Sequence, residues 1–140
     1  MAGWAWFVGY TLGALKWRYV MVETISREEL KEKMDRGDDF VLVDTLAEMY
    51  YRHSHLPGAI NMPVDEVRDR APELLPDREA EIVIYCMDLP CQASEEAARE
   101  LEAMGYANVR DYVGGKHDWI EHCLPAEGRY YERRRQHAAD

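Results

Sequence analysis

The chain alternates between short, uninterrupted apolar runs and longer segments of helical periodicity. Two runs, Phe40–Val43 and Ile82–Tyr85, are apolar at every position. Continuous runs of this length are typical of strands that are buried on both faces of a parallel sheet. Three weaker runs of β type accompany them at Tyr19–Val22, Ala59–Asn61 and Asn108–Val113.

Helical segments separate these runs. Ser26 and Glu29 have the spacing of a capping box, and Gly37 is a helix stop signal. A strong amphipathic pattern covers residues 94–104 and ends at Gly105. Weaker helical patterns cover residues 48–52, 64–75 (interrupted by Pro72) and 116–122. Strands that alternate with helices predict an α/β fold, with a central, mostly parallel sheet and helices on both faces.

The pattern divides the chain into three parts. Residues 1–18 form an apolar aromatic arm, residues 19–127 a folded domain, and residues 128–140 a polar C-terminal tail, expected to be a solvated helix end or frayed. The uncharged stretch Ala2–Leu15 would span about 21 Å as a helix, which is shorter than the hydrocarbon core of a bilayer. We therefore expect the arm to pack on the domain or on a second copy in a homodimer. Membrane contact through residues 1–18 is not favoured, and a start upstream of the domain stays open.

Charge and cysteine content narrow the function. The 140 residues carry a formal net charge of -10, which argues against nucleic acid as a partner. A small anionic substrate would therefore have to be attracted locally. Three cysteines are too few for a disulfide framework, so we expect free thiols in a reducing, cytoplasmic setting.

Cys86 is the most informative residue of the sequence. It ends the apolar run Ile82–Tyr85 and precedes a short loop and a helix. In parallel α/β sheets the reactive site lies beyond the carboxyl ends of the strands. Backbone N–H groups and a helix N-terminus would favour the thiolate there, so we interpret Cys86 as a nucleophile.

Five segments in order resemble the rhodanese domain, the fold of the sulfurtransferases, over roughly residues 20–127. The resemblance rests on Val41-Leu42-Val43-Asp44, on His55-Leu56-Pro57-Gly58-Ala59-Ile60-Asn61-Met62-Pro63, on Ile82-Val83-Ile84-Tyr85-Cys86, on Ala97-Ala98 through Gly105-Tyr106, and on Gly114-Gly115 with Trp119.

This resemblance implies a specific chemistry. Rhodaneses take a sulfane sulfur onto the active-site cysteine as a persulfide and pass it to a nucleophile such as cyanide or another thiol, which is covalent catalysis by a ping-pong route. Cys86 would be the sulfur carrier, and no metal or organic cofactor would be needed. The partners would be a small sulfur donor or a persulfide-bearing protein, and an acceptor thiol. The N–H groups of the loop would hold the anionic persulfide. The loop residues are Met87, Asp88, Leu89, Pro90, Cys91 and Gln92.

The sequence also departs from the family pattern. The loop after Cys86 is about two residues longer than the common type, and it contains Asp88 but no basic residue. A dianion such as thiosulfate would meet little positive charge, so a neutral or protein-bound persulfide is the more compatible donor. Cys91 lies on the same loop and could resolve a Cys86 persulfide or sulfenate as a disulfide, or could only pack there. Asp44 could be a base, but a loop-holding role through backbone N–H groups is favoured.

Other chemistries fit less well. A Cys-x5-Arg phosphatase needs an arginine where this chain has Gln92. A zinc site would have a loose spacing and no second compact pair. We expect His55 to anchor its turn, Trp119 and Cys123 to be buried, and His117 and His122 to lie at the surface. A binding or redox-sensing module that uses the Cys86–Cys91 pair without turnover is the main alternative to an enzyme.

Overall fold

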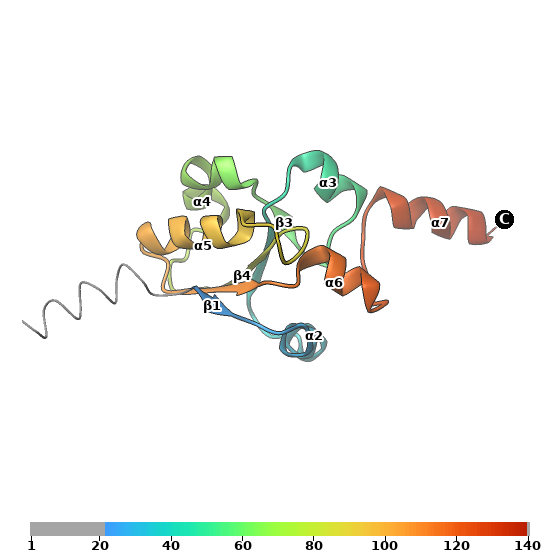
Figure 1. Ribbon diagram of the computed structural model, residues 1–140, viewed down its shortest axis with the longest axis horizontal. Coiled ribbons are helices and arrows are strands. Elements are labelled where there is room, and N and C mark those ends of the chain that lie inside the picture. Colours follow the sequence, from blue (N-terminus) through green and yellow to red (C-terminus); the bar gives the residue numbers. More distant parts are fainter. Residues whose placement is uncertain (1–21, 140) are drawn as a thin grey trace, which may run out of the picture.

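A parallel β-sheet forms the centre of the molecule (Figure 1). The computed structural model describes residues 22–139, and within that range the sheet has five strands in the order β1-β5-β4-β2-β3. Every neighbouring pair is parallel, which confirms the predicted sheet. The strands are β1 (Glu23–Thr24), β2 (Val41–Asp44), β3 (Ile60–Asn61), β4 (Glu81–Tyr85) and β5 (Asn108–Tyr112).

Helices cover both faces of this sheet, as predicted. On one face, α4 and α5 pack around Ile82 and Ile84 of β4 (Figure 1). On the other face, α2 and α6 enclose Val83 and Tyr85, with Trp119 at the centre of the cluster. The helical elements are α2 (Arg27–Arg36), α3 (Glu48–His53), η1 (Val64–Glu66), α4 (Val67–Leu74), α5 (Ala93–Ala103), α6 (Gly115–Glu121) and α7 (Arg129–Ala139).

The cover of the sheet explains why the run Ile82–Tyr85 of strand β4 is apolar at every position. Successive side chains of a strand point to opposite faces of the sheet. Because helices cover both faces, all four residues of Ile82–Tyr85 are buried. The last of them brings the chain to Cys86 at the carboxyl edge of the sheet, between the ends of β2 and β5.

The start of α2 uses half of the predicted capping box. The Ser26 hydroxyl accepts the Glu29 N–H at 3.1 Å, and Gly37 ends the helix with a φ of 71°. The Glu29 carboxylate does not reach back to the cap, since it binds the Arg110 guanidinium at 2.7 Å. The second half of the motif therefore ties α2 to strand β5.

Two local expectations are wrong, and a third is mostly untested. Pro72 does not interrupt the helical segment 64–75, because it lies inside α4. The segment instead changes from a 3-10 helix to an α-helix at Val67. The buried side chains of Val67 and Ala71 hold this helix on the sheet, which offsets the backbone hydrogen bond that Pro72 cannot make. Cys123 is exposed, with a φ of 58° in the turn after α6. The expected run 19–22 lies mostly outside the described residues; Val22 is not in a strand, and the first strand among residues 22–139 is Glu23–Thr24.

Other expectations are confirmed. Trp119 is fully buried, and His117 and His122 are exposed. The His55 ring bonds the Tyr51 carbonyl oxygen at 2.8 Å and stacks on the Tyr51 ring.

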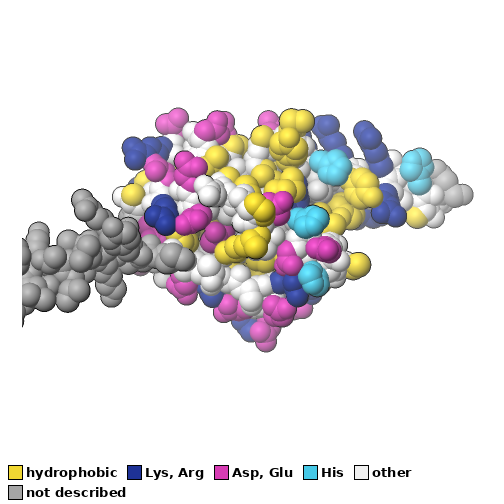
Figure 2. Space-filling view, in the orientation of Figure 1, with side chains coloured by type: hydrophobic (Ala, Val, Ile, Leu, Met, Phe, Trp, Pro, Cys, Tyr) yellow, Lys and Arg dark blue, Asp and Glu magenta, His cyan; other side chains and the backbone are white. Residues whose placement is uncertain are grey.

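The polar C-terminal segment is an eleven-residue helix, α7, none of whose described residues is buried. It extends away from the sheet next to α3 (Figure 1), and basic side chains gather on this end of the molecule (Figure 2). The apolar arm at residues 1–18 lies outside the described residues. Among residues 22–139, we find no helix with the length and apolar content needed to cross a bilayer.

Candidate active site at Cys86

Cys86 follows the central strand directly, and helix α6 fixes the backbone at this point. The N–H of Lys116 donates to the Cys86 carbonyl at 2.9 Å, and the N–H of His117 donates to the Met87 carbonyl at 2.7 Å. Gly115 allows this close approach. A Cβ atom there would lie 2.7 Å from the Cys86 carbonyl oxygen, and its φ of +69° is one that side chains disfavour. Gly115 therefore lets α6 hold the backbone at Cys86.

The Cys86 thiol is buried, with 1% of the residue exposed. Its sulfur lies 3.4 Å from the Ser94 hydroxyl oxygen and 3.5 Å from the Cys91 carbonyl oxygen. Burial raises the pKa of the Cys86 thiol to about 11, and the adjacent Cys91 thiol adds to the rise, whereas the hydroxyl and the backbone N–H of Ser94 lower it. The expectation of a favoured thiolate is therefore wrong for this conformation. The N-terminus of α5 acts in the predicted direction, but burial outweighs it.

The loop Met87–Gln92 leads from Cys86 into α5. It contains a turn in which the Cys91 N–H donates to the Asp88 carbonyl at 3.1 Å. Leu89 at its tip is 71% exposed, and Cys91 is half-buried. Within this loop the sulfur of Cys86 has carbonyl oxygens as its backbone partners, at Asp88 and Cys91. The loop thus holds an uncharged, protonated thiol in this state.

Asp44 ends β2, next to the end of β4, and it is fully buried. One oxygen of its carboxyl group accepts the Leu46 N–H at 2.9 Å, which is the loop-holding bond that the sequence predicted. Burial raises the pKa of this carboxyl. The buried Lys116 side chain attracts the Asp44 carboxyl group. The Lys116 ammonium also donates hydrogen bonds to the carbonyl oxygens of Tyr50 and Ser54, at 3.0 and 2.9 Å. Asp44 and Lys116 therefore join β2, α3 and α6 beneath the site.

Sequence reasoning missed three residues near the thiol: Ser94, Asp111 and Lys116. Ser94 lies in the first turn of α5 and contacts the Cys86 sulfur, a role that its position before the helical pattern could have suggested. Asp111 is buried on β5, and its Oδ1 has no partner among the described residues. Burial raises the pKa of the Asp111 carboxyl, and a hydrogen bond from Ser94 lowers it. The sequence signal that could have identified Asp111 is a charged residue inside the β-type run Asn108–Val113.

A cleft of about 370 Å³ opens beside the loop, on the side of β1 and β5. Its wall includes Cys91, Ser94 and Asp111, and the apolar side chains of Leu89 and Pro90 form the rim on the loop side. The loop contains no lysine or arginine, and neither does the part of the cleft wall that residues 22–139 form. The site therefore suits a neutral ligand better than a dianion.

The comparisons with known proteins agree with this architecture. A family model described as "Rhodanese-like domain" matches residues 26–122. The Bacillus subtilis protein YrkF is 34% identical over 98 residues, which are 70% of this chain and 51% of that protein, so the chain spans about half the length of this relative. A sulfurtransferase of Allochromatium vinosum is 30% identical over 105 residues, covering 75% of this chain and 94% of that protein.

Solved structures give the same result. The crystal structure of the Alr3790 protein from Anabaena superposes with a TM-score of 0.69 at 25% identity, covering 81% of this chain and 99% of that one. The match to the family model covers strands β2 to β5, the Cys86 loop and the Gly-Gly turn beside it, whereas β1 precedes it. The chain belongs to the rhodanese-like domain family.

Proposed function

We propose that the protein is a sulfurtransferase that carries sulfane sulfur as a persulfide on Cys86. The observation that supports this most directly is the position of Cys86. It lies immediately after the central strand of the sheet, with its backbone held by α6 and its sulfur against the first turn of α5. The sulfurtransferase from Allochromatium vinosum, with 94% of its length covered, supports the same activity.

The reaction has two balanced steps. The Cys86 thiolate attacks the outer sulfur of a donor persulfide R–S–SH, a new S–S bond forms on Cys86, and the donor leaves as the thiolate RS⁻. An acceptor thiolate then attacks the outer sulfur of the Cys86 persulfide, which yields the acceptor persulfide and restores the Cys86 thiolate. No oxidant is consumed in either step.

The thiol must lose its proton before the first step. The hydroxyl and N–H of Ser94 are the groups that lower the pKa of Cys86, so they stabilise the attacking thiolate. The anionic persulfide would gain more from loop N–H groups than from the carbonyls that contact the sulfur in this state. A turn of the peptide groups between Met87 and Gln92 would supply those N–H groups.

The donor follows from the charges at the site. The loop has no basic side chain and includes Asp88, whose carboxylate would repel a dianion. We therefore propose a neutral or protein-bound persulfide as donor in preference to thiosulfate.

A redox role for the Cys86–Cys91 pair is the second candidate. The contact between the Cys86 sulfur and the Cys91 residue favours it, since both cysteines lie on one loop and both are free thiols. Attack of the Cys91 thiolate on the inner sulfur of a Cys86 persulfide would form a disulfide and release HS⁻.

Intact mass spectrometry tests the main proposal. The protein is incubated with cysteine persulfide and, separately, with thiosulfate, in a Cys123→Ser background that removes the exposed thiol, and Cys86→Ser in this background serves as the control. We expect one added sulfur with cysteine persulfide, less with thiosulfate, and none in the control. Sulfur that adds equally to Cys86→Ser would overturn the role of Cys86. In Cys91→Ser, an unchanged lifetime of the persulfide would remove the resolving role.

A further inference from the structure

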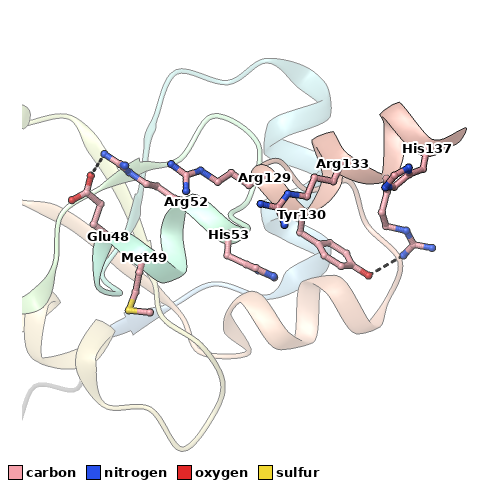
Figure 3. A pocket seen from close by; sticks show the side chains of 9 residues that line it. Glu48, Met49, Arg52, His53, Arg129, Tyr130, Arg133 and His137 are labelled. Atoms are coloured by element: carbon pink, nitrogen blue, oxygen red, sulfur yellow. Dashed lines mark hydrogen bonds and ion pairs between the residues drawn. The ribbon is translucent and has the colours of Figure 1, made fainter. Parts of the chain in front are cut away.

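Helices α3 and α7 enclose a groove of about 650 Å³ that the proposed chemistry does not use (Figure 3). These helices are far apart in the sequence, and α7 lies outside the segment that matches the family model. The groove is lined by Glu48, Met49, Arg52, His53, Arg129, Tyr130, Arg133, Arg134 and His137.

The charge of this groove is opposite to that of the chain. Four arginines and a single carboxylate line it, whereas the whole chain carries -10. Figure 3 shows Arg52, Arg129 and Arg133 together along one side of the groove. Arg52 pairs with Glu48, but Arg129 and Arg133 have no carboxylate within 4.0 Å among residues 22–139. Cations that are grouped without counter-charges repel one another, and an anionic ligand would relieve this repulsion.

The other side of the groove is aromatic and apolar. The Tyr130 ring stacks on His53, with ring centroids 5.3 Å apart, and the Tyr130 hydroxyl accepts a hydrogen bond from Arg134 at 3.0 Å. Met49 and Tyr130 are 69% and 41% exposed, although both are large apolar side chains. Figure 3 shows Met49, His53 and Tyr130 along the side opposite to the arginine group. A ligand of this groove would therefore combine negative charges with an apolar surface.

The spacing of the basic residues on α7 indicates the shape of such a ligand. Arg129, Arg133 and His137 follow one another at intervals of four residues on α7. They form a row about 12 Å long, with steps of about 6 Å. Carboxylates four residues apart on another helix have the same step, whereas a single phosphate would engage only one end of the row.

We propose that the groove between α3 and α7 binds an acidic amphipathic helix of a protein that exchanges sulfur with Cys86. Arg129 and Arg133 bind its carboxylates, and Met49 and Tyr130 contact its apolar side chains. Helix α3 follows the carboxyl end of β2, and Cys86 follows the carboxyl end of the neighbouring strand β4. The docked helix therefore lies at the same edge of the sheet as the thiol. Sulfur exchange with this partner rests on the proposed function, but binding does not.

A binding experiment tests the groove without sulfur chemistry. The probe is a labelled helical peptide of about 13 residues, with Glu at every fourth position and Leu on the adjacent row. Its affinity for the Cys86→Ser protein is measured by fluorescence anisotropy at several salt concentrations. We expect saturable binding that weakens with salt, and a loss of at least roughly tenfold in Arg129→Glu/Arg133→Glu, with a smaller loss in Arg129→Gln/Arg133→Gln.

The matched control is Arg68→Glu/Arg99→Glu, which makes the same charge change on exposed positions of α4 and α5. It should bind the peptide within about twofold of the parent protein. An equal loss in both Glu variants would show non-specific attraction and would overturn the proposal. Saturable binding of ADP or of anionic vesicles, with no binding of the peptide, would overturn it in favour of a phosphate ligand or a membrane.

A second measurement tests the link to sulfur exchange. The same peptide, extended by a cysteine persulfide, is compared with free cysteine persulfide as a donor to Cys86. The ratio of the two loading rates should fall roughly tenfold in Arg129→Glu/Arg133→Glu. An unchanged ratio, with peptide binding lost, would overturn the sulfur-partner role of the groove. If neither donor loads Cys86, the proposed function fails, while the binding result stands by itself.

Discussion

The sulfur of Cys86 lies 3.4 Å from the hydroxyl oxygen of Ser94, and hydrogen bonding by the same hydroxyl lowers the pKa of the buried Asp111 carboxyl. One serine in the first turn of α5 therefore acts on both the thiol that follows β4 and a carboxyl group of β5. A hydroxyl has one proton, so Ser94 cannot donate to the thiolate and to the carboxylate at the same time. A protonated Asp111 would leave the Ser94 proton available to the Cys86 thiolate.

Replacing Ser94 by alanine should make Cys86 less reactive. The Ser94 hydroxyl lowers the pKa of the thiol, so its loss leaves the Ser94 backbone N–H alone to oppose burial, which raises that pKa. We expect alkylation of Cys86 by iodoacetamide at pH 8 to slow by roughly tenfold, which corresponds to one pKa unit. The rate is measured by mass spectrometry in a Cys91→Ser/Cys123→Ser background. An unchanged rate would mean that the hydroxyl does not act on the thiolate, and Ser94→Thr, which keeps a hydroxyl, serves as the control.

The pH profile of the resting protein should show a protonated thiol. Because burial raises the pKa of Cys86 to about 11, the thiolate fraction rises about tenfold with each pH unit through the neutral range. Alkylation of Cys86 should therefore increase log-linearly from pH 7 to 10, without a plateau. The same Cys91→Ser/Cys123→Ser protein provides the measurement. A plateau reached below pH 8 would contradict the buried state of the thiol.

Replacing Gly115 by alanine should disturb the site, and Gly37 provides a matched comparison. Both glycines have a positive φ, of 69° and 71°, but an added Cβ at Gly37 would meet nothing within 4 Å. At Gly115 the Cβ would lie 2.7 Å from the Cys86 carbonyl and 2.9 Å from the Met87 carbonyl carbon. We expect Gly37→Ala to cost about 1 kcal/mol of unfolding free energy and Gly115→Ala about 3 kcal/mol or more.

Urea denaturation and persulfide loading check this pair. Gly115→Ala should slow the loading of Cys86, since the added methyl displaces the backbone of that residue, whereas Gly37→Ala should load at the parent rate. Equal stability losses in the two variants would show that the contact between Gly115 and the Cys86 backbone does not constrain the fold.

The sequence predicted the sheet and its helices because each depends on a local, repeated signal. The run Ile82–Tyr85 of β4 is apolar at every position for the reason that the sequence indicates, namely cover on both faces. The interruption at Pro72 was wrong because buried contacts of Val67 and Ala71 override a local backbone penalty. The position of Cys86 could be predicted, since it follows from the order of strand, loop and helix.

The chemistry of the site depended on burial, which the sequence pattern does not measure. A helix N-terminus at the end of a strand indicated a thiolate, but the closed loop removes water from the sulfur and reverses the net shift of its pKa. Asp111 and Lys116 approach the site from β5 and α6 through tertiary packing. The groove between α3 and α7 joins segments that are about 80 residues apart, and no local signal connects them.

Replacing Asp111 by asparagine should stabilise the protein at neutral pH and much less in acid. Burial raises the pKa of this carboxyl in the folded state, and its Oδ1 has no partner among the described residues. A group whose folded pKa is raised binds more protons when folded, so its contribution to stability is fully present below the unfolded pKa, near 4, and is lost as pH rises through the folded pKa. Asparagine fits the same space and does not ionise, so the loss of stability with rising pH should disappear in Asp111→Asn.

Urea denaturation at pH 4 and pH 7 measures this effect. The free energy of unfolding of Asp111→Asn should exceed that of the parent protein by more at pH 7 than at pH 4. The control is Glu95→Gln, at an exposed position of α5 where Glu95 pairs with Arg99. This change removes a nearby charge that also raises the pKa of Asp111, but it leaves the buried carboxyl in place. Glu95→Gln should therefore reproduce only a small part of the difference. A difference that is equal at both pH values would mean that Asp111 does not titrate between them, and that its carboxyl has the same protonation state when it faces Ser94 at pH 4 and at pH 7.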